Sequence, residues 1–282
     1  MKTLITGASG FIGKSLIKQL PPGQIHVVSR KKSMSSSNGI FEHLGDLQNE
    51  SFLKYLANQK FERVIHLAWA GLPELTPKNN SFNLAVSKKF LKIMADSGVS
   101  EINVSGSCLE YGDLDTFVSE DTTGTNIGQF GECKLELLQS VQALGISYRW
   151  LRIFYAYGPN QHPNSLLSAA YDSAMKQMTF HPKDPTQARD FVFIDDVAAA
   201  FVQLLKQKNV TGVFNVGSGK STGVTDILSC LYSQLEMPQV ETKVSVNSLH
   251  ADLRKIEAAC GWKPRVNLNE GINGFITWRR NT

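Results

Sequence analysis

Three glycines near the N-terminus suit a phosphate-binding turn, although their spacing is Gly-x-x-Gly-x-x-Gly and not the Gly-x-Gly-x-x-Gly of many dehydrogenases. They stand in Thr6-Gly7-Ala8-Ser9-Gly10-Phe11-Ile12-Gly13, between an expected strand and an expected helix. Glycines in such a turn let the backbone approach a pyrophosphate, and the amino end of the helix attracts the anion. A glycine-rich turn without a ligand is the alternative, but the position at the first strand–helix junction favours a dinucleotide. The expected contacts are Gly7, Gly10, Phe11, Ile12 and Gly13.

A basic residue follows the second expected strand. The strand ends in Val27-Val28-Ser29, and Arg30-Lys31-Lys32 comes next. In NAD sites an acidic residue about 20 positions beyond the glycines binds the ribose hydroxyls. A guanidinium at this place pairs instead with a 2′-phosphate, which an acidic residue would repel. Arg30 therefore predicts NADP(H) rather than NAD, unless it is an ordinary exposed charge at a strand end.

Two further strand ends supply candidate cofactor contacts. Asp46 and Leu47 follow the third strand, and Asp46 is expected either to accept the adenine amino group or to cap the next helix. Ala68, after the fourth strand, is small enough to let the cofactor lie close. His66, at the end of that strand, is expected to be structural rather than catalytic.

Strands and helices alternate over the first half of the chain. This alternation predicts an α/β fold, a doubly wound Rossmann-type parallel sheet covered on both faces, with a smaller C-terminal substrate-binding lobe. The expected strands are Lys2–Thr6, Ile25–Ser29, Phe41–Leu44, Arg63–Leu67, Glu101–Ser105 and Tyr148–Ile153. The expected helices are Phe11–Gln19, Gln48–Asn58, Ser81–Asp96 and Gly128–Ala143.

The pattern changes at about Tyr155. Gly, Pro, Asn and Gln interrupt it in the segment 158–164. We therefore expect an NADP-binding domain over residues 1–155, with strands that return later in the chain, and a mainly substrate-binding lobe over residues 156–282. The serine run Ser33–Ser37 predicts a mobile loop.

Composition favours a soluble globular protein. Of the 282 residues, 42% are hydrophobic and 19% charged. The net charge of +4 comes from scattered basic residues, so nucleic acid is not an expected partner. No apolar run is long enough to span a membrane, and the N-terminus looks like a strand rather than a signal peptide. None of the four cysteines form a Cys-x-x-Cys pair, so we expect no metal site and a cytoplasmic location.

Several motifs in sequence order resemble the extended short-chain dehydrogenase/reductase family, which includes nucleotide-sugar epimerases, dehydratases and 4-keto reductases. The resemblance covers nearly the whole chain. Besides the glycine turn, its motifs are Gly106-Ser107-Cys108-Leu109-Glu110-Tyr111-Gly112, Leu151-Arg152-Ile153-Phe154-Tyr155-Ala156-Tyr157-Gly158-Pro159, Arg189-Asp190-Phe191-Val192-Phe193-Ile194-Asp195-Asp196-Val197, Asn215-Val216-Gly217-Ser218-Gly219 and Gly261-Trp262-Lys263-Pro264.

The resemblance implies a catalytic set of a Ser or Thr followed by Tyr-x-x-x-Lys. In the family the lysine lowers the tyrosine pKa and holds the nicotinamide ribose, and the tyrosine exchanges a proton with the sugar oxygen. The serine position is Ser107, and Lys134 is the lysine. Phe130 stands at the tyrosine position. Phe has no hydroxyl and cannot donate a proton.

Three interpretations of Phe130 are open. The chain is an engineered Tyr-to-Phe variant made to trap a complex, or it uses another acid such as Tyr111 or water. In the third, it is a non-catalytic relative. The resemblance also implies a sugar near Ser107, Trp69 and Phe130, with Tyr155 where the family commonly has Asn. The alternative for Trp69 is a place in the core.

Arg189 matches the family position that contacts the nucleotide diphosphate. Its alternative role is a structural salt bridge with Asp190 or Asp195. Because reductases commonly consume NADPH, Arg30 favours an NADPH-dependent reductase of a nucleotide-linked 4-keto-6-deoxy sugar. The alternatives are a nucleotide-sugar epimerase with bound NAD(P) and a non-catalytic NADP-sensing protein. In the family, the helices matching Ser81–Asp96 and Gly128–Ala143 pair across a dimer interface, so we expect a homodimer.

Overall fold

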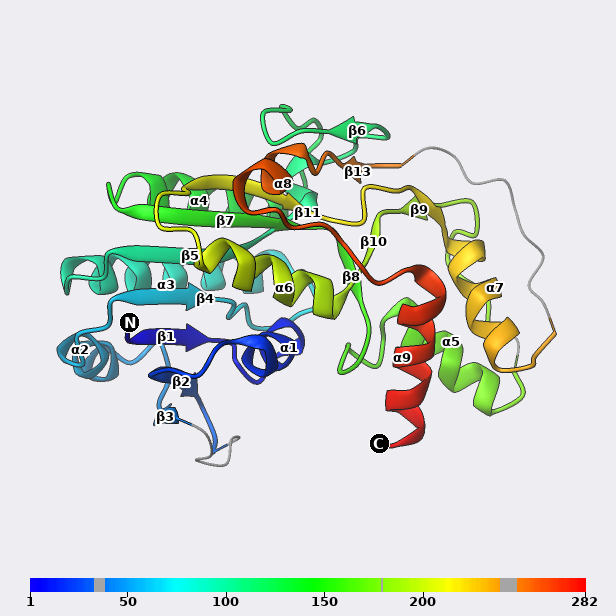
Figure 1. Cartoon of the computed structure of the whole chain (residues 1–282), viewed down its shortest axis with the longest axis horizontal. Coiled ribbons are helices and arrows are strands. Elements are labelled where there is room, and N and C mark those ends of the chain that lie inside the picture. Colours follow the sequence, from blue (N-terminus) through cyan, green and yellow to red (C-terminus); the bar gives the residue numbers. More distant parts are fainter. Residues whose placement is uncertain (33–38, 179, 239–247) are drawn as a thin grey trace.

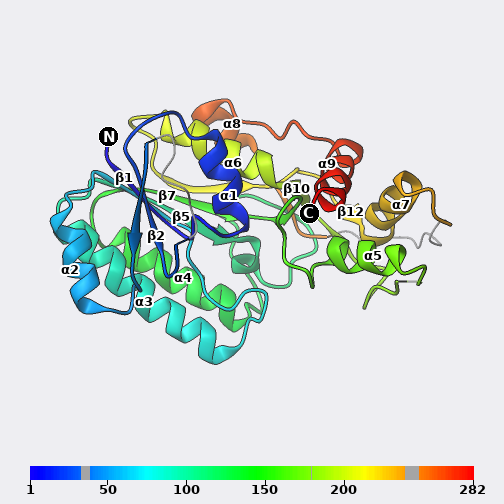
Figure 2. The ribbon, with the colours of Figure 1, turned by 90° about the horizontal axis from the view of Figure 1, so that it is seen from below.

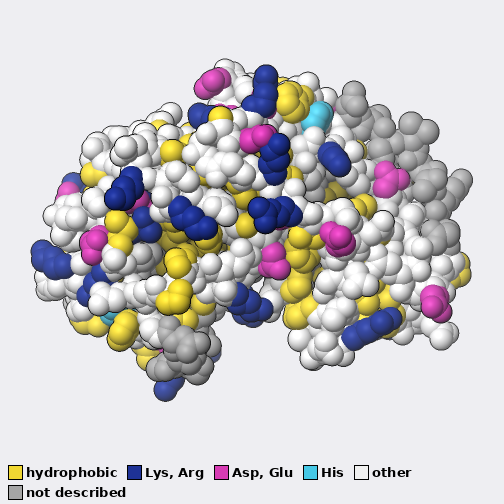
Figure 3. All heavy atoms as spheres, in the orientation of Figure 1, with side chains coloured by type: hydrophobic (Ala, Val, Ile, Leu, Met, Phe, Trp, Pro, Cys, Tyr) yellow, Lys and Arg dark blue, Asp and Glu magenta, His cyan; other side chains and the backbone are white. Residues whose placement is uncertain are grey.

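The computed structural model describes residues 1–32, 39–178, 180–238 and 248–282 (Figure 1). The expected loop at Ser33–Ser37 lies outside these residues. None of the helices in the described ranges combines the length and the apolar character needed to cross a membrane. On the face drawn in Figure 3, Lys and Arg side chains are spread among acidic and neutral ones rather than gathered in one patch.

A seven-stranded sheet forms the centre of the described structure. Its order is β11-β7-β5-β4-β1-β2-β3, and every pair of neighbours is parallel. The order reverses between β1 and β4, which in doubly wound sheets is where ligands bind, at the carboxyl ends of the strands. The strands are β1 (Thr3–Thr6), β2 (Ile25–Ser29), β3 (Ile40–Leu44), β4 (Arg63–His66), β5 (Glu101–Ser107), β7 (Ser147–Ile153) and β11 (Gly212–Val216).

Helices cover both faces of this sheet (Figure 2). One face is covered by α1 (Phe11–Gln19), α6 (Ile194–Leu205) and α8 (Arg254–Cys260), and the other by α2 (Glu50–Asn58), α3 (Pro77–Asp96) and α4 (Gln129–Gln142). Neighbouring strand residues point to opposite faces, so Leu4 and Ile5 belong to different buried clusters. The predicted doubly wound α/β fold is confirmed.

Two helix starts differ from the sequence predictions by two residues or more, and capping explains both. α2 begins at Glu50 because the Asn49 side chain accepts from the backbone N–H of Phe52, at 3.0 Å. The proposal that Asp46 caps this helix is therefore wrong. α3 begins at Pro77, after the N-cap Thr76, one turn before the predicted start. Pro is favoured in the first turn because its missing N–H has no partner there.

Shorter elements lie beyond the carboxyl edge of the sheet and to one side of it (Figure 1). The short helix η1 (Cys108–Tyr111) follows β5 directly. Three two-stranded pairs follow: β8 (Tyr155–Tyr157) with β10 (Phe191–Phe193), β9 (Ala188–Arg189) with β12 (Thr222–Gly223), and β6 (Phe117–Val118) with β13 (His250–Ala251). The helices α5 (Leu166–Met175), α7 (Val224–Gln234) and α9 (Leu268–Arg280) pack together there.

The second half of the chain contributes to both parts of the molecule. The strand β11 and the helices α6 and α8 join the layers of the main sheet, whereas α5, α7 and α9 do not. One buried apolar cluster runs from the sheet face under α6 to the packed helices α5 and α9. Tyr171 and Phe275 meet edge to face inside it, with ring centroids 5.9 Å apart. The main sheet and the packed helices therefore share one continuous core.

Candidate functional site

A cleft of about 640 Å³ opens at the carboxyl ends of β1, β2 and β4. Its position is the reversal point of the strand order, where the fold itself favours ligand binding. Every cofactor residue predicted from the sequence except Lys134 lines it. These residues are Gly7, Gly10, Phe11, Ile12, Gly13, Arg30, Asp46, Leu47 and Ala68.

The glycine turn is packed so tightly that side chains are excluded. Gly7 has φ +74°, and a Cβ there would lie 2.7 Å from the Ala68 nitrogen. A Cβ on Gly13 would collide with the carbonyl oxygen of Gly7. The N-cap residue of α1, Gly10, has no side-chain cap, and the first turn holds no acidic residue. Backbone N–H groups at this helix start therefore suit a pyrophosphate.

Two polar side chains line the far part of the cleft. Arg30 is exposed directly after β2. The Asp46 carboxylate accepts from the backbone N–H of Gln48 at 2.9 Å, which fixes its direction without consuming both oxygens. A cation and an anchored carboxylate thus stand where the ribose and adenine end of a dinucleotide would lie.

His66 is held by two hydroxyls. Its Nδ1 lies 2.7 Å from the Thr6 hydroxyl and its Nε2 lies 2.9 Å from the Ser87 hydroxyl. Burial, together with the nearby Lys134 charge, lowers the pKa of His66 to about 3. The neutral, fully bonded ring has a structural role, as the sequence suggested.

The three positions to which the resemblance assigns catalysis lie where α4 meets the end of β5. Gly131 allows this approach, because a Cβ there would collide with the carbonyl oxygen of Leu109 in η1. Lys134 is buried, and its Nζ donates to the Ser105 carbonyl at 2.9 Å. Phe130, one turn earlier, has its ring centroid 5.7 Å from that Nζ.

The indole ring of Trp69 packs against both Lys134 and Phe130. The Lys134 Nζ lies 4.0 Å from the centroid of the indole, which attracts the cation. Phe130 meets the same indole edge-on at 5.5 Å. The Trp69 nitrogen donates to Asn80 at 3.4 Å, and the ring is buried. Trp69 therefore belongs to the core and also lines the cleft.

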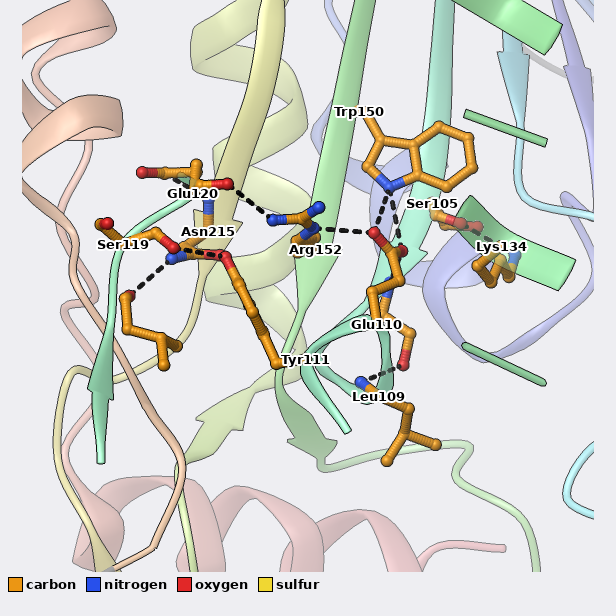
Figure 4. Close-up of polar contacts among 12 residues, drawn as sticks. Ser105, Leu109, Glu110, Tyr111, Ser119, Glu120, Lys134, Trp150, Arg152 and Asn215 are labelled. Atoms are coloured by element: carbon orange, nitrogen blue, oxygen red, sulfur yellow. Dashed lines mark hydrogen bonds and ion pairs between the residues drawn. The ribbon is translucent and has the colours of Figure 1, made fainter. Parts of the chain in front are cut away.

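Ser107 is fixed by its own turn. Its hydroxyl oxygen accepts from the backbone N–H of Leu109 at 3.2 Å, and its own N–H donates to Glu110 at 2.8 Å. Glu110 is buried and also accepts from Trp150 and Arg152 (Figure 4). In the sequence, Glu110 stood out only as part of the motif Gly106–Gly112. Its position between Leu109 and Tyr111 was the sequence feature that could have indicated a buried carboxylate.

Tyr111 is not available as the missing acid. Its ring is fully buried, and its hydroxyl lies 2.8 Å from the Asn215 side-chain oxygen and 3.0 Å from the Ser119 carbonyl (Figure 4). Burial raises the pKa of Tyr111 to about 12. The interpretation that Tyr111 replaces the tyrosine lost at Phe130 is therefore wrong, because a buried, bonded hydroxyl cannot reach a substrate.

Arg189 and Tyr155 form a separate pair beyond the cleft. The guanidinium carbon of Arg189 lies 5.1 Å from the Tyr155 ring centroid. Arg189 donates to the backbone carbonyl of Ala188 and to the side-chain oxygen of Gln187. Asp190 is buried and accepts from the backbone of Ser218, and Asp195 accepts from the helix α1. The suggested salt bridge of Arg189 is therefore wrong. Neither Arg189 nor Tyr155 lines the cofactor cleft.

The cleft wall also includes residues that were not singled out in the sequence, and two of them come from far along the chain. Asn160 and His162 line the cleft from the segment that follows β8. The Asn160 side chain accepts from Lys14 at 3.1 Å, which joins this segment to α1. Both residues lie in the Pro- and Asn-rich stretch that signalled a break in the regular pattern, and residue type alone did not separate a turn from a cleft wall.

Comparison with known proteins agrees with this arrangement. Residues 3–217 match the family model described as the NAD dependent epimerase/dehydratase family. A putative UDP-glucose 4-epimerase of Methanocaldococcus jannaschii is 25% identical, over 99% of this chain and 98% of its own. A dTDP-4-dehydro-6-deoxyglucose reductase of Escherichia coli is 26% identical, over 97% of this chain and 96% of its own.

Solved structures share the fold over the full length. MoeE5 in complex with UDP-glucuronic acid and NAD superimposes with a TM-score of 0.87 at 26% identity, covering 100% of this chain and 99% of its own. The family match spans the glycine turn, the cleft, the Ser107 turn and Lys134. From its fold, its cleft and this match, the chain belongs to the NAD-dependent epimerase/dehydratase family, the extended short-chain dehydrogenases/reductases.

Proposed function

We propose that the chain binds NADP(H) in the cleft and reduces the 4-keto group of a nucleotide-linked 4-keto-6-deoxy sugar. The observation that carries the proposal is Arg30, a cation that lines the cleft directly after β2, where an NAD site would have an acid. A reductase consumes its hydride donor, and cells commonly supply that donor as NADPH. The reductase of E. coli, similar over nearly its whole length, supports the reaction class.

The site residues divide the work. The dinucleotide, when bound, supplies the hydride that adds to C4 of the sugar. Lys134 holds the nicotinamide ribose, and the Ser107 hydroxyl donates to the keto oxygen. Because Phe130 has no hydroxyl and Tyr111 is buried, the proton for that oxygen comes from water. Arg189 binds the diphosphate, and Tyr155 and Trp69 border the hexose.

An epimerase that keeps NAD bound is the second candidate. The solved complexes of MoeE5 contain NAD together with UDP-glucuronic acid or UDP-glucose. The M. jannaschii relative is named an epimerase. These observations favour a reaction in which the cofactor takes a hydride from a UDP-sugar and then returns it to the same sugar. A protein that senses NADP without catalysis is the remaining alternative. It requires that variants at position 130 convert no nucleotide-linked sugar.

The test compares the chain with its Phe130→Tyr variant. NADPH oxidation is followed by absorbance, in single turnover, with dTDP-, CDP-, GDP- and UDP-linked 4-keto-6-deoxy sugars. We expect the restored hydroxyl to raise the rate about 10²–10⁴-fold, as general acid catalysis does, with little change in substrate affinity. Epimerisation without net NADPH loss would replace the proposal with the second candidate. No turnover in either protein, with cofactor still bound, would favour the sensor.

We further propose a cytoplasmic homodimer. The helices α3 and α4 pack side by side on one face of the sheet, and the corresponding helices pair across the dimer interface in the family that the chain resembles. We assign residues 1–155 to the cofactor domain and residues 156–282 mainly to the substrate lobe. The proposal of an engineered Tyr-to-Phe change at Phe130 stays a prediction.

A further inference from the structure

Glu110 is a buried carboxylate to which the proposed reaction gives no role. It lies in η1, directly behind Ser107, and its oxygens accept from three nitrogen donors. The Arg152 Nε lies at 2.7 Å, the Trp150 nitrogen at 2.9 Å and the Ser107 backbone nitrogen at 2.8 Å. Burial raises the pKa of Glu110. All three partners can only donate, however, so the ionised form fits this surrounding.

The chain makes room for this carboxylate. A Cβ on Gly106 would collide with the Trp150 nitrogen and lie 2.7 Å from the nearer oxygen of Glu110. Gly106 has an extended neighbour on each side in β5, and no turn explains a glycine there. The missing side chain is what lets the indole nitrogen reach Glu110. Gly106, Trp150 and Arg152 together allow the Glu110 carboxylate to be buried next to the Ser107 turn.

Lys134 lies on the opposite side of Glu110 from Arg152 (Figure 4), and its charge interacts with that carboxylate. The other titratable groups that face Lys134 are Cys133 on its own helix and His66 from β4. Burial raises the pKa of the Cys133 thiol and lowers the pKa of His66 to about 3, so both are neutral at neutral pH. Among these neighbours in the described chain, Glu110 supplies the negative charge.

We propose that Glu110 is a positioning residue of this site: its carboxylate holds the Ser107 turn through the backbone N–H and keeps Lys134 cationic. The roles of Ser107 and Lys134 rest on the proposed function. The link of Glu110 to Ser107 rests on a hydrogen bond, and its link to Lys134 rests on the placement of the two side chains in Figure 4. Burial lowers the pKa of Lys134 to about 8, and the Glu110 charge opposes this change. Lys134 therefore loses its proton near neutral pH if the carboxylate is removed.

The experiment titrates Lys134 directly in the chain without ligand. Lysine is labelled with ¹³C at Cε, and the Lys134 signal is assigned by its loss in Lys134→Met. In Glu110→Gln, the midpoint of the Lys134 titration is expected to fall by about one pH unit. Glu120→Gln is the matched control, because Glu120 accepts from the Asn215 backbone at the far end of the same polar network. It should leave the midpoint unchanged.

Two additional variants guard against misfolding. Glu110→Asp keeps the charge but shortens the side chain, so Lys134 should titrate nearly as in the parent chain. Glu110→Gln combined with Arg152→Gln removes both members of the buried pair, and it should still lower the Lys134 midpoint. An unchanged midpoint in either Gln variant, measured in folded protein, would overturn the proposal.

A second measurement tests whether the Lys134 charge affects cofactor binding. NADPH affinity is measured by fluorescence at pH 6 and at pH 8. At pH 6 Lys134 is protonated in both proteins, so Glu110→Gln should bind about as tightly as the parent. At pH 8 the variant should bind about fivefold more weakly, because fewer molecules keep the Lys134 proton. Equal loss at both pH values would indicate a merely structural role. Neither readout uses a sugar substrate, so failure of the reductase proposal leaves this test intact.

Discussion

Two buried Glu–Arg clusters stand at opposite ends of the same two strands. At the amino ends of β5 and β7, Glu101 pairs with Arg149 at 2.7 Å and with Arg63 at 2.5 Å. At the carboxyl ends, Glu110 pairs with Arg152, also at 2.7 Å. The residue types and the ion-pair distances are alike. What differs is the neighbourhood of each cluster.

The amino-end cluster closes a helix. Arg149 donates to the Gln207 carbonyl and Arg63 donates to the Leu205 carbonyl at 3.3 Å, where α6 has just ended. Carbonyls at a helix end lack intrahelical partners and carry partial negative charge, so two guanidinium groups suit them. The carboxyl-end cluster instead lies beside Ser107 and Lys134. The same chemistry therefore serves stability at one edge of the sheet and the proposed site at the other.

The largest expected effect is at the amino edge. Arg149 is 0% exposed, so Arg149→Met leaves part of the Glu101 charge and a helix end without a partner. Breaking a buried pair typically costs about 3–5 kcal/mol. Urea unfolding should show this loss, while NADPH affinity of the folded fraction stays at the parent value. A matching loss of affinity in folded protein would break the comparison, because it would give the amino edge a role in binding.

The second largest effect is a loss of cofactor affinity at the carboxyl edge of the sheet, without a loss of stability. Arg30 is exposed and its side chain supports no buried structure, so Arg30→Ala should leave the urea midpoint unchanged. A charge-assisted contact to the 2′-phosphate is worth about 1.5–3 kcal/mol, so NADP(H) affinity should fall by about 10–100-fold. NAD(H) affinity should not change. Calorimetric titration of both cofactors decides this, and equal affinity of the parent chain for the two would remove the argument for NADP(H).

The smallest effect is a pH dependence that arises at the end of β4. The folded pKa of His66 is about 3, against about 6.5 in the unfolded chain, so the unfolded state binds more protons between these values. The stability contributed by neutral His66 is complete above pH 6.5 and is lost as the pH falls toward 3. We expect about 1–2 kcal/mol less stability at pH 5 than at pH 7.

Urea midpoints across this range test the histidine. His26 and His43 also have pKa values lowered by burial, and that of His26 lies at about 4, so part of the slope belongs to them. The comparison of the parent with His66→Gln isolates the His66 share. If both proteins lose stability with the same slope, His66 is not the titrating group.

The sequence by itself determined the features that depend on neighbours along the chain. Strand–helix alternation predicted the doubly wound sheet, and the helix Phe11–Gln19 was placed at its observed bounds. The glycine turn was recognised because a positive φ and a close backbone approach leave no room for a side chain. These constraints act within a few residues, so their pattern is visible in the order of the letters.

Tertiary structure decided which polar groups are buried and with whom. Glu110 and Arg152 are 42 positions apart, and the Tyr111 hydroxyl meets Asn215 across 104 positions. In the sequence Tyr111 looked available as an acid and Glu110 was one letter of a motif. Adjacent parallel strands and a returning β11 brought these partners together. Burial and hydrogen bonding then fixed whether each group stays charged, and no local spacing encodes that outcome.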